Sequence, residues 1–181
     1  MNATGTGAQP LPQPSGLGKT LRDLLPLAVA LLVFAAAEWY LLTQGWLLGT
    51  WTLAAFLAFH GLIHLMFLNP KPPEAAAGGM SYPFDPARSW PVTRLGVGAP
   101  TVRGLAVGLS AIVAITFILA GLATVGLIVP TDWWAGLIVG SSVLSLALFA
   151  LTFSPSLALG IAIDLVLLWV VWSGAWTPGA V

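Results

Sequence analysis

Five apolar segments, each with at most one charged residue, constrain this chain more than any other feature of its sequence. They cover residues 24–42, 47–68, 104–129, 133–153 and 156–172, and each is close to the length that an α-helix needs to cross a bilayer. The chain is 58% hydrophobic and 7% charged. Soluble domains are about one-quarter charged. The sequence therefore predicts an all-α polytopic membrane helix bundle with five transmembrane helices.

The first apolar segment has a second interpretation. Lys19 and Arg22 precede it, and three alanines at 35–37 lie near its end, which is also typical of a secretory signal with its cleavage site. We interpret it as a retained membrane helix. The residues before it are rich in Gly and Pro and lack an apolar pattern, so residues 1–23 are expected to form a flexible cytoplasmic tail. Residues 173–181 are expected to form a short tail on the non-cytoplasmic side.

The connection 69–103 is the only long polar stretch between apolar segments, and its seven prolines predict a loop without helix. Two interpretations remain open for its second half: a cap over the helix ends at the headgroup level, or a docking surface for another subunit. The candidate docking residues mix aromatic and charged side chains, and they are Tyr82, Phe84, Asp85, Arg88 and Trp90.

Two residue classes predict one orientation. If the N-terminus is cytoplasmic, five crossings place loop 69–103 on the same side, and all six Lys and Arg residues are then cytoplasmic. Tryptophan favours the membrane interface. Seven tryptophans map to the opposite side, namely Trp39, Trp46, Trp51, Trp133, Trp134, Trp172 and Trp176. We therefore expect a protein of the cytoplasmic (inner) membrane with a non-cytoplasmic C-terminus.

Polar residues within the apolar segments are the candidates for function, because ionisable groups at bilayer depth are costly. His60 and His64 are four residues apart and share one helix face. Asp164 and His60 are both about 12 Å from the cytoplasmic end of their segments, at 1.5 Å per residue. With Ser110 and Ser145 at similar depth, the predicted polar layer consists of His60, Ser110, Ser145 and Asp164. Glu38, near an outer end, is expected to reach water.

Four interpretations of this layer remain open. A buried hydrogen bond between His60 and Asp164 would fix two helices against each other. A transition metal such as Zn²⁺ or Cu²⁺ could be held by His60, His64 and Asp164. A haem or chlorophyll-type pigment could be bound by His60 or His64 singly, with Gly61 leaving room for the macrocycle. A proton relay could run through both histidines and Asp164. Because the chain has no cysteine, thiolate-bound cofactors are excluded.

Small residues spaced by four predict close helix packing in lipid. They are Gly104 and Gly108; Ala106, Ser110 and Ala114; Gly136 and Gly140; and Gly160, four residues before Asp164.

The segment HGLIHL, a later loop with Pro and Trp, a span that begins with Trp-Trp and the final LGIAIDLVLL together resemble a group of small uncharacterised bacterial four-helix membrane proteins. In that group an HGxxH helix comes first and an Asp-containing helix comes last. The resemblance covers about residues 53–172, with His60, Gly61, His64 and Asp164 at the matching positions. It implies a four-helix bundle and no established activity. The additional first helix of this chain departs from the pattern and suits lateral association.

The sequence contains no nucleophile constellation and no phosphate-binding loop, so we expect a protein that is not an enzyme. Without a basic patch it is not expected to bind nucleic acid. The expected role is an accessory, assembly or stabilising subunit of a larger membrane complex, for example an energy-transducing one, in contact with lipid and with other membrane subunits. The alternative is a membrane-embedded metal-, haem- or chlorophyll-type-binding protein, or a proton- or ion-handling protein, that uses His60, His64 and Asp164.

Overall fold

The structure is a computed structural model that describes residues 16–68, 89–153 and 157–178. Helices account for its regular secondary structure, and the described residues contain no strand. In chain order the elements are α1 (Gly16–Thr43), α2 (Leu47–Ile63), the 3-10 segment η1 (His64–Leu68), α3 (Trp90–Leu95), α4 (Ala99–Thr124), the 3-10 segment η4 (Thr131–Trp133), α5 (Trp134–Leu151) and α6 (Ala158–Ser173).

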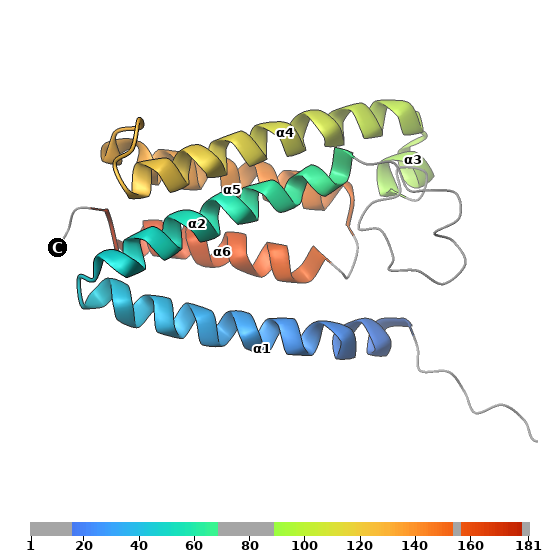
Figure 1. Ribbon diagram of the computed structural model, residues 1–181. Helices are drawn as coiled ribbons and strands as arrows, with labels where there is room; N and C mark the ends of the chain where they lie inside the picture. The colour runs from blue at the N-terminus through green and yellow to red at the C-terminus, as the bar shows by residue number, and fades with distance from the viewer. Residues whose placement is uncertain (1–15, 69–88, 154–156, 179–181) are drawn as a thin grey trace, which may run out of the picture.

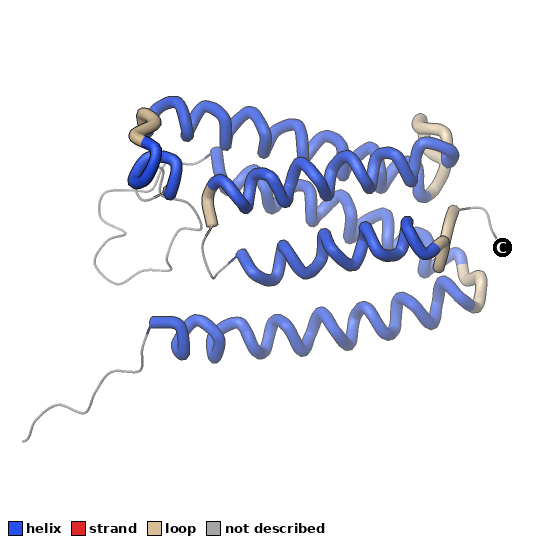
Figure 2. Tube along the Cα trace, turned by 180° about the vertical axis from the view of Figure 1, so that it is seen from behind, coloured by secondary structure: helices blue, strands red, loops and turns tan. Residues whose placement is uncertain are grey.

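The five longer helices lie side by side and alternate in direction (Figure 1). The start of α1, the end of η1, α3, the end of α5 and the start of α6 share one end of the molecule, which we call the α3 end. The α1–α2 turn, the α4–α5 connection and the end of α6 share the opposite end, as Figure 2 shows from behind. Gly45 closes the α1–α2 turn at a φ of 69°, a backbone conformation that glycine adopts without steric cost.

Helix α4 packs against both α2 and α5, and α6 packs against α5. Apolar side chains fill two buried clusters in this four-helix bundle. The cluster toward the opposite end includes Leu57, Phe117 and Ile138. The cluster toward the α3 end includes Phe67 and Leu148. Because the chain passes from one cluster to the other along each helix, the polar residues between them lie in the middle of the bundle.

Two glycines allow α2 and α4 to approach closely. A Cβ added to Gly121 of α4 would lie 2.6 Å from the carbonyl oxygen of Ala54 in α2, and one added to Gly61 of α2 would lie 2.9 Å from that of Ala114 in α4. On the α5–α6 contact, an added Cβ at Gly160 would meet the ring of Phe149 at 2.8 Å. Backbone contact at glycine is thus a main feature of the packing.

The small residues that the sequence singled out divide into two groups. Ala106, Ser110 and Ala114 are buried along α4, and Gly160 lies at a helix contact. The remaining glycines have open space where a Cβ would stand, so the prediction that they bring helices together is wrong within this chain; they are Gly104, Gly108, Gly136 and Gly140. Spacing alone identifies a ridge of small residues but not the direction it faces.

Helix α1 stands apart from the four-helix bundle. It packs chiefly on α2. Only 6% of the most apolar stretch of α1 is buried inside the molecule. The corresponding share is 33% to 39% in the other three helices of spanning length. Large apolar side chains such as Leu32 and Val33 are exposed along it. Among the described residues of α1, Leu42 alone belongs to a buried cluster, so α2, α4, α5 and α6 form most of the core.

Four helices are long and apolar enough to cross a membrane: residues 24–43, 47–68, 99–124 and 131–151. The fifth predicted span corresponds to α6, which is apolar but has 16 residues. At 1.5 Å per residue it is about 24 Å long, somewhat shorter than a hydrocarbon core of about 30 Å.

Several helix boundaries differ from those expected from the sequence. Helix α1 begins at Gly16, so residues 16–23 are helical and not part of a flexible tail. Helix α4 covers 99–124 instead of 104–129, and the prediction that loop 69–103 lacks helix is wrong for α3 and the start of α4. Both helices carry a proline in their first turn, where the missing N–H would have had no helical partner.

Candidate functional site

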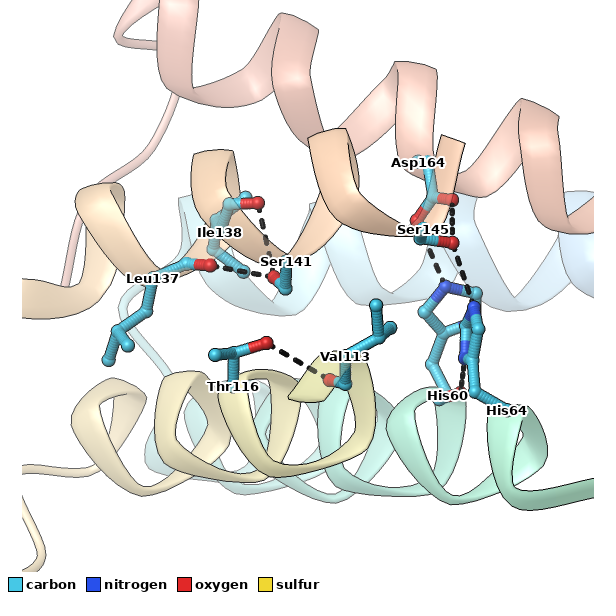
Figure 3. A network of polar contacts seen from close by, with 9 residues as sticks. All are labelled: His60, His64, Val113, Thr116, Leu137, Ile138, Ser141, Ser145 and Asp164. Atoms are coloured by element: carbon cyan, nitrogen blue, oxygen red, sulfur yellow. Dashed lines mark hydrogen bonds and ion pairs between the residues drawn. The ribbon is translucent and has the colours of Figure 1, made fainter. Parts of the chain in front are cut away.

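His60 and Asp164 lie in direct contact in the interior of the bundle. The Nε2 atom of His60 on α2 is 3.1 Å from Oδ1 of Asp164 on α6, although the two residues are 104 positions apart in the chain (Figure 3). The His60 residue is 4% exposed and Asp164 is fully buried. A buried acid and imidazole stabilise the fold only if their remaining polar atoms also have partners.

Ser145 is the partner of the second Asp164 oxygen, and His64 continues the network from Ser145 to the backbone of His60. His64 donates from Nδ1 to the backbone carbonyl of His60 at 2.9 Å, and its Nε2 lies 2.8 Å from Oγ of Ser145 on α5. The hydroxyl of Ser145 is in turn 2.5 Å from Oδ2 of Asp164. The four contacts form a ring that begins and ends on His60, and Figure 3 shows both imidazoles pointing toward Ser145 and Asp164. We call these four residues the polar ring.

Helical geometry explains how the polar ring is assembled. The spacing of four residues brings His64, the first residue of η1, one turn beyond His60 of α2 on the same side, where its Nδ1 reaches the His60 carbonyl. Ser145 precedes the α5–α6 connection by about as many residues as Asp164 follows it, so the two are level on antiparallel neighbours. At Gly61 the backbones of α2 and α4 are in close contact, so the face of α2 that carries His60 lies inside the bundle.

Phenylalanine rings surround the two imidazoles. The ring of Phe117 lies edge-on to His60 with centroids 4.8 Å apart, and Phe149 stacks on His64 at 5.4 Å. Phe56 stacks on His60 at 6.0 Å. The polar ring is therefore enclosed by aromatic surface, where its electrostatic interactions are stronger than in water.

The three predicted metal ligands are brought together but are spread more widely than one ion requires. Ligand atoms of His60, His64 and Asp164 lie within 4.8 Å of one another. Two ligands of one zinc ion are at most about 4.2 Å apart, twice a Zn–N bond of about 2.1 Å. Each inward-facing nitrogen also has an oxygen at hydrogen-bonding distance. The geometry is that of a hydrogen-bonded network, and metal binding would require the ring to contract.

A tetrapyrrole does not fit beside His60. The sequence predicted space next to Gly61, but α4 occupies it, and an added Cβ there would lie 2.8 Å from Cβ of Phe117. The prediction of room for a macrocycle at this position is wrong. The Nε2 atoms of both histidines also contact Asp164 and Ser145 within the bundle, so neither nitrogen is free to bind the central metal of a macrocycle.

Two other sequence-based site predictions have different outcomes. Ser110 is buried at the expected depth, but its hydroxyl donates to the Val107 carbonyl of its own helix at 2.9 Å and takes no part in the polar ring. Of the predicted docking loop, Tyr82, Phe84, Asp85 and Arg88 lie outside the described residues. Trp90 begins α3, and its indole N–H donates to the Ala150 carbonyl near the end of α5 at 2.6 Å.

A second buried carboxylate was missed by the sequence reasoning. Glu38 was expected to reach water from α1, but it is only 6% exposed, and its Oε2 accepts a hydrogen bond of 2.6 Å from Thr52 of α2. Its Oε1 has no hydrogen-bond partner among the described residues. The available signal was the short α1–α2 turn, which brings the end of one helix alongside the start of the next.

No protein-family model matches this chain, and no curated protein and no solved structure matches it.

Proposed function

We propose that this chain is a multi-pass membrane protein that crosses the bilayer five times, with its N-terminus and α3 end in the cytoplasm. Four helices of spanning length and the shorter apolar α6 support this proposal. The described basic side chains Arg22, Arg94 and Arg103 belong to elements at the α3 end. Most tryptophans belong to helix termini at the opposite end, as expected at the other membrane interface.

Cysteine labelling tests this topology, because the natural chain has no cysteine to remove. Leu95 at the α3 end and Thr131 at the opposite end are both exposed. A membrane-impermeant maleimide should label Thr131→Cys in intact cells and Leu95→Cys only after permeabilisation. The reverse pattern, or labelling of both in intact cells, contradicts the proposed topology.

We further propose that the protein is a non-catalytic accessory, assembly or stabilising subunit of a larger membrane complex in the cytoplasmic (inner) membrane. The observation that carries this proposal is the position of α1. The polar ring and both core clusters include no side chain of α1 apart from Leu42 near its end. A helix that adds little to its own bundle, and exposes apolar side chains along its length, is available for lateral contact with another subunit.

In this role the polar ring holds the helices of the bundle together through interhelical hydrogen bonds. It joins α2, α5 and α6, and interhelical hydrogen bonds between polar side chains in lipid stabilise a bundle by about 0.6 to 2 kcal/mol. The bundle is then a rigid support for α1.

Site-specific photo-crosslinking in the native membrane tests the accessory role. A photoreactive residue is placed at Leu32 or Val33 of α1, and in matched controls at Ile112 or Ile115 of α4; all four side chains are at least 49% exposed. We expect one defined protein adduct from the α1 positions and none from the α4 positions, which should react with lipid. Equal reaction with lipid at all four positions contradicts the proposal.

A second candidate function, proton handling, is favoured by a specific observation: an acid, a hydroxyl and an imidazole follow one another in hydrogen-bonded order within the bundle.

A further inference from the structure

The hydrogen atoms of the polar ring can be counted from its heavy-atom contacts. A backbone carbonyl can only accept, so the contact between Nδ1 of His64 and the His60 carbonyl fixes a proton on that nitrogen. If His64 is neutral, its Nε2 carries a lone pair and must accept from Ser145. If His64 is charged, Nε2 donates to Ser145 instead.

The number of protons that the ring requires depends on Ser145, because its hydroxyl has a single hydrogen. Its oxygen contacts two groups, Nε2 of His64 at 2.8 Å and Oδ2 of Asp164 at 2.5 Å. When the hydroxyl donates to His64, the contact with Asp164 needs a proton on the carboxyl group. When it donates to Asp164, the contact with His64 needs a proton on Nε2.

Four contacts therefore require four protons. One is on Nδ1 of His64, one comes from the hydroxyl of Ser145, and one comes from Nε2 of neutral His60, which donates to Oδ1 of Asp164. These are the only three that two neutral imidazoles and a serine supply to the ring. We propose that the polar ring is a binding site for one additional proton, carried by Asp164 as a carboxylic acid or by His64 as an imidazolium.

Both arrangements leave the ring without net charge, and they interconvert without movement of any heavy atom. The Oδ2–H bond of Asp164 breaks as a new Oγ–H bond forms on Ser145, while the original hydroxyl hydrogen of Ser145 passes to Nε2 of His64. One proton leaves Asp164, one arrives at His64, and no electrons change hands. Ser145 is the positioning residue that connects the two proton carriers.

The surroundings favour this neutral state. On the helices packed around the ring, the described residues include one other ionisable side chain, Arg103, which is exposed in the first turns of α4. Glu38 of α1 is hydrogen-bonded to Thr52, about two turns from His60 along α2. Without the additional proton the ring would hold an uncompensated negative charge in a Phe-lined interior and lose one of its four hydrogen bonds, which is costly.

Vibrational and nitrogen spectra of the full chain in lipid nanodiscs test the proposal at neutral pH. Infrared spectra report a protonated carboxyl group through its C=O stretch, which shifts in D₂O, and ¹⁵N spectra report the protonation of each imidazole nitrogen. We expect one additional proton per chain, as an Asp164 carboxylic acid with two neutral imidazoles or as an Asp164 carboxylate with a doubly protonated His64. An ionised Asp164 beside a neutral His64 overturns the proposal, whether or not His60 is charged, as does the presence of both proton carriers at once.

Two variants assign the signals. Asp164→Asn should fold, because its amide oxygen can accept from His60 and its N–H can donate to Ser145, as the protonated acid does. It should abolish the signal of the additional proton. Glu38→Gln removes the other buried carboxyl group and should leave that signal unchanged. A carboxylic acid band that disappears in Glu38→Gln and persists in Asp164→Asn belongs to Glu38, and together with a neutral His64 it overturns the proposal. ¹³C-aspartate labelling of the unmodified chain provides the same distinction if a variant fails to fold.

A pH series gives an independent readout. Loss of a proton that is bound only in the folded state lowers stability as pH rises. The unmodified chain should therefore lose more unfolding free energy than Asp164→Asn as the pH rises, because the buried Glu38 is present in both proteins and contributes equally to them. Parallel pH dependence of the two proteins contradicts the proposal.

Discussion

His60 on α2 and Asp164 on α6 are in hydrogen-bonding contact at 3.1 Å between two helices that do not follow one another in the chain. The contact is buried and continues through Ser145 and His64, so removal of one partner leaves the others unsatisfied.

A double-mutant cycle measures this coupling. Replacing His60 or Asp164 singly by leucine should lower the unfolding free energy by about 1 to 3 kcal/mol, because each change leaves a buried polar partner without a hydrogen bond. The double variant should be less destabilised than the sum of the two, by about 0.6 to 2 kcal/mol. Reversible unfolding in mixed micelles provides the measurement. Strict additivity would show that the two side chains do not interact.

Gly121 and Gly108 offer a matched test of the packing, since both lie within α4. An added methyl group at Gly121 would be 2.6 Å from the Ala54 carbonyl oxygen, whereas Gly108 has open space. Gly121→Ala should destabilise the bundle by about 1 to 3 kcal/mol through overpacking. Gly108→Ala should be neutral or stabilise by at most about 1 kcal/mol, because alanine is the better helix former. Thermal unfolding of the two variants in one detergent decides; equal effects would refute the α2–α4 contact.

Thr52 attaches α1 to the bundle through Glu38. Thr52→Val keeps the shape of the side chain and removes the hydroxyl that donates to the carboxylate. We expect faster amide hydrogen exchange in α1, while exchange in α4 and α5 stays as in the unmodified chain. The physical reason is that α1 packs chiefly on α2 and opens separately from the remaining helices. Uniform acceleration across all helices would show that α1 is an integral part of the core.

Metal analysis separates the hydrogen-bonded ring from a coordination site. Protein purified after growth with added zinc and copper should contain far less than one metal ion per chain, because Nε2 of each histidine and both Asp164 oxygens already have hydrogen-bond partners. One tightly bound ion per chain that is lost in His60→Ala would contradict this expectation. Cys-free composition removes thiolates as competing ligands, which makes the measurement direct.

The sequence was informative where helical periodicity and depth determine position. The depth of Asp164 in the last apolar segment matched that of His60, and the same arithmetic placed Ser145 nearby, because regular helices convert residue number into height. Rotation about the helix axis was harder to predict. Ser110 has the right height, but its hydroxyl turns back to its own helix, and Gly104 and Gly108 face outward where contact was expected.

The errors at helix ends have two causes, which are prolines in the first turn of a helix and a hydrogen bond between neighbouring helices. Pro91 and Pro100 lie in the first turns of α3 and α4, where a proline is compatible with a helix, so a high proline content does not exclude helix there. Glu38 was placed in water by its depth alone, whereas its partner Thr52 depends on how α1 folds back on α2. Whether two side chains on either side of a turn form a hydrogen bond depends on how each helix is rotated about its own axis, and the sequence does not specify this rotation.

The distance between the His60 imidazole and the Asp164 carboxyl group in a lipid bilayer tests the central claim most directly. Solid-state NMR can measure the dipolar coupling between the ¹⁵N-labelled His60 side chain and the ¹³C-labelled Asp164 carboxyl carbon, with His64→Gln used to assign the histidine signals. We expect strong coupling, as direct hydrogen-bonding contact requires. Absence of coupling, with both side chains directed to lipid on separate faces, would contradict the polar ring and everything inferred from it.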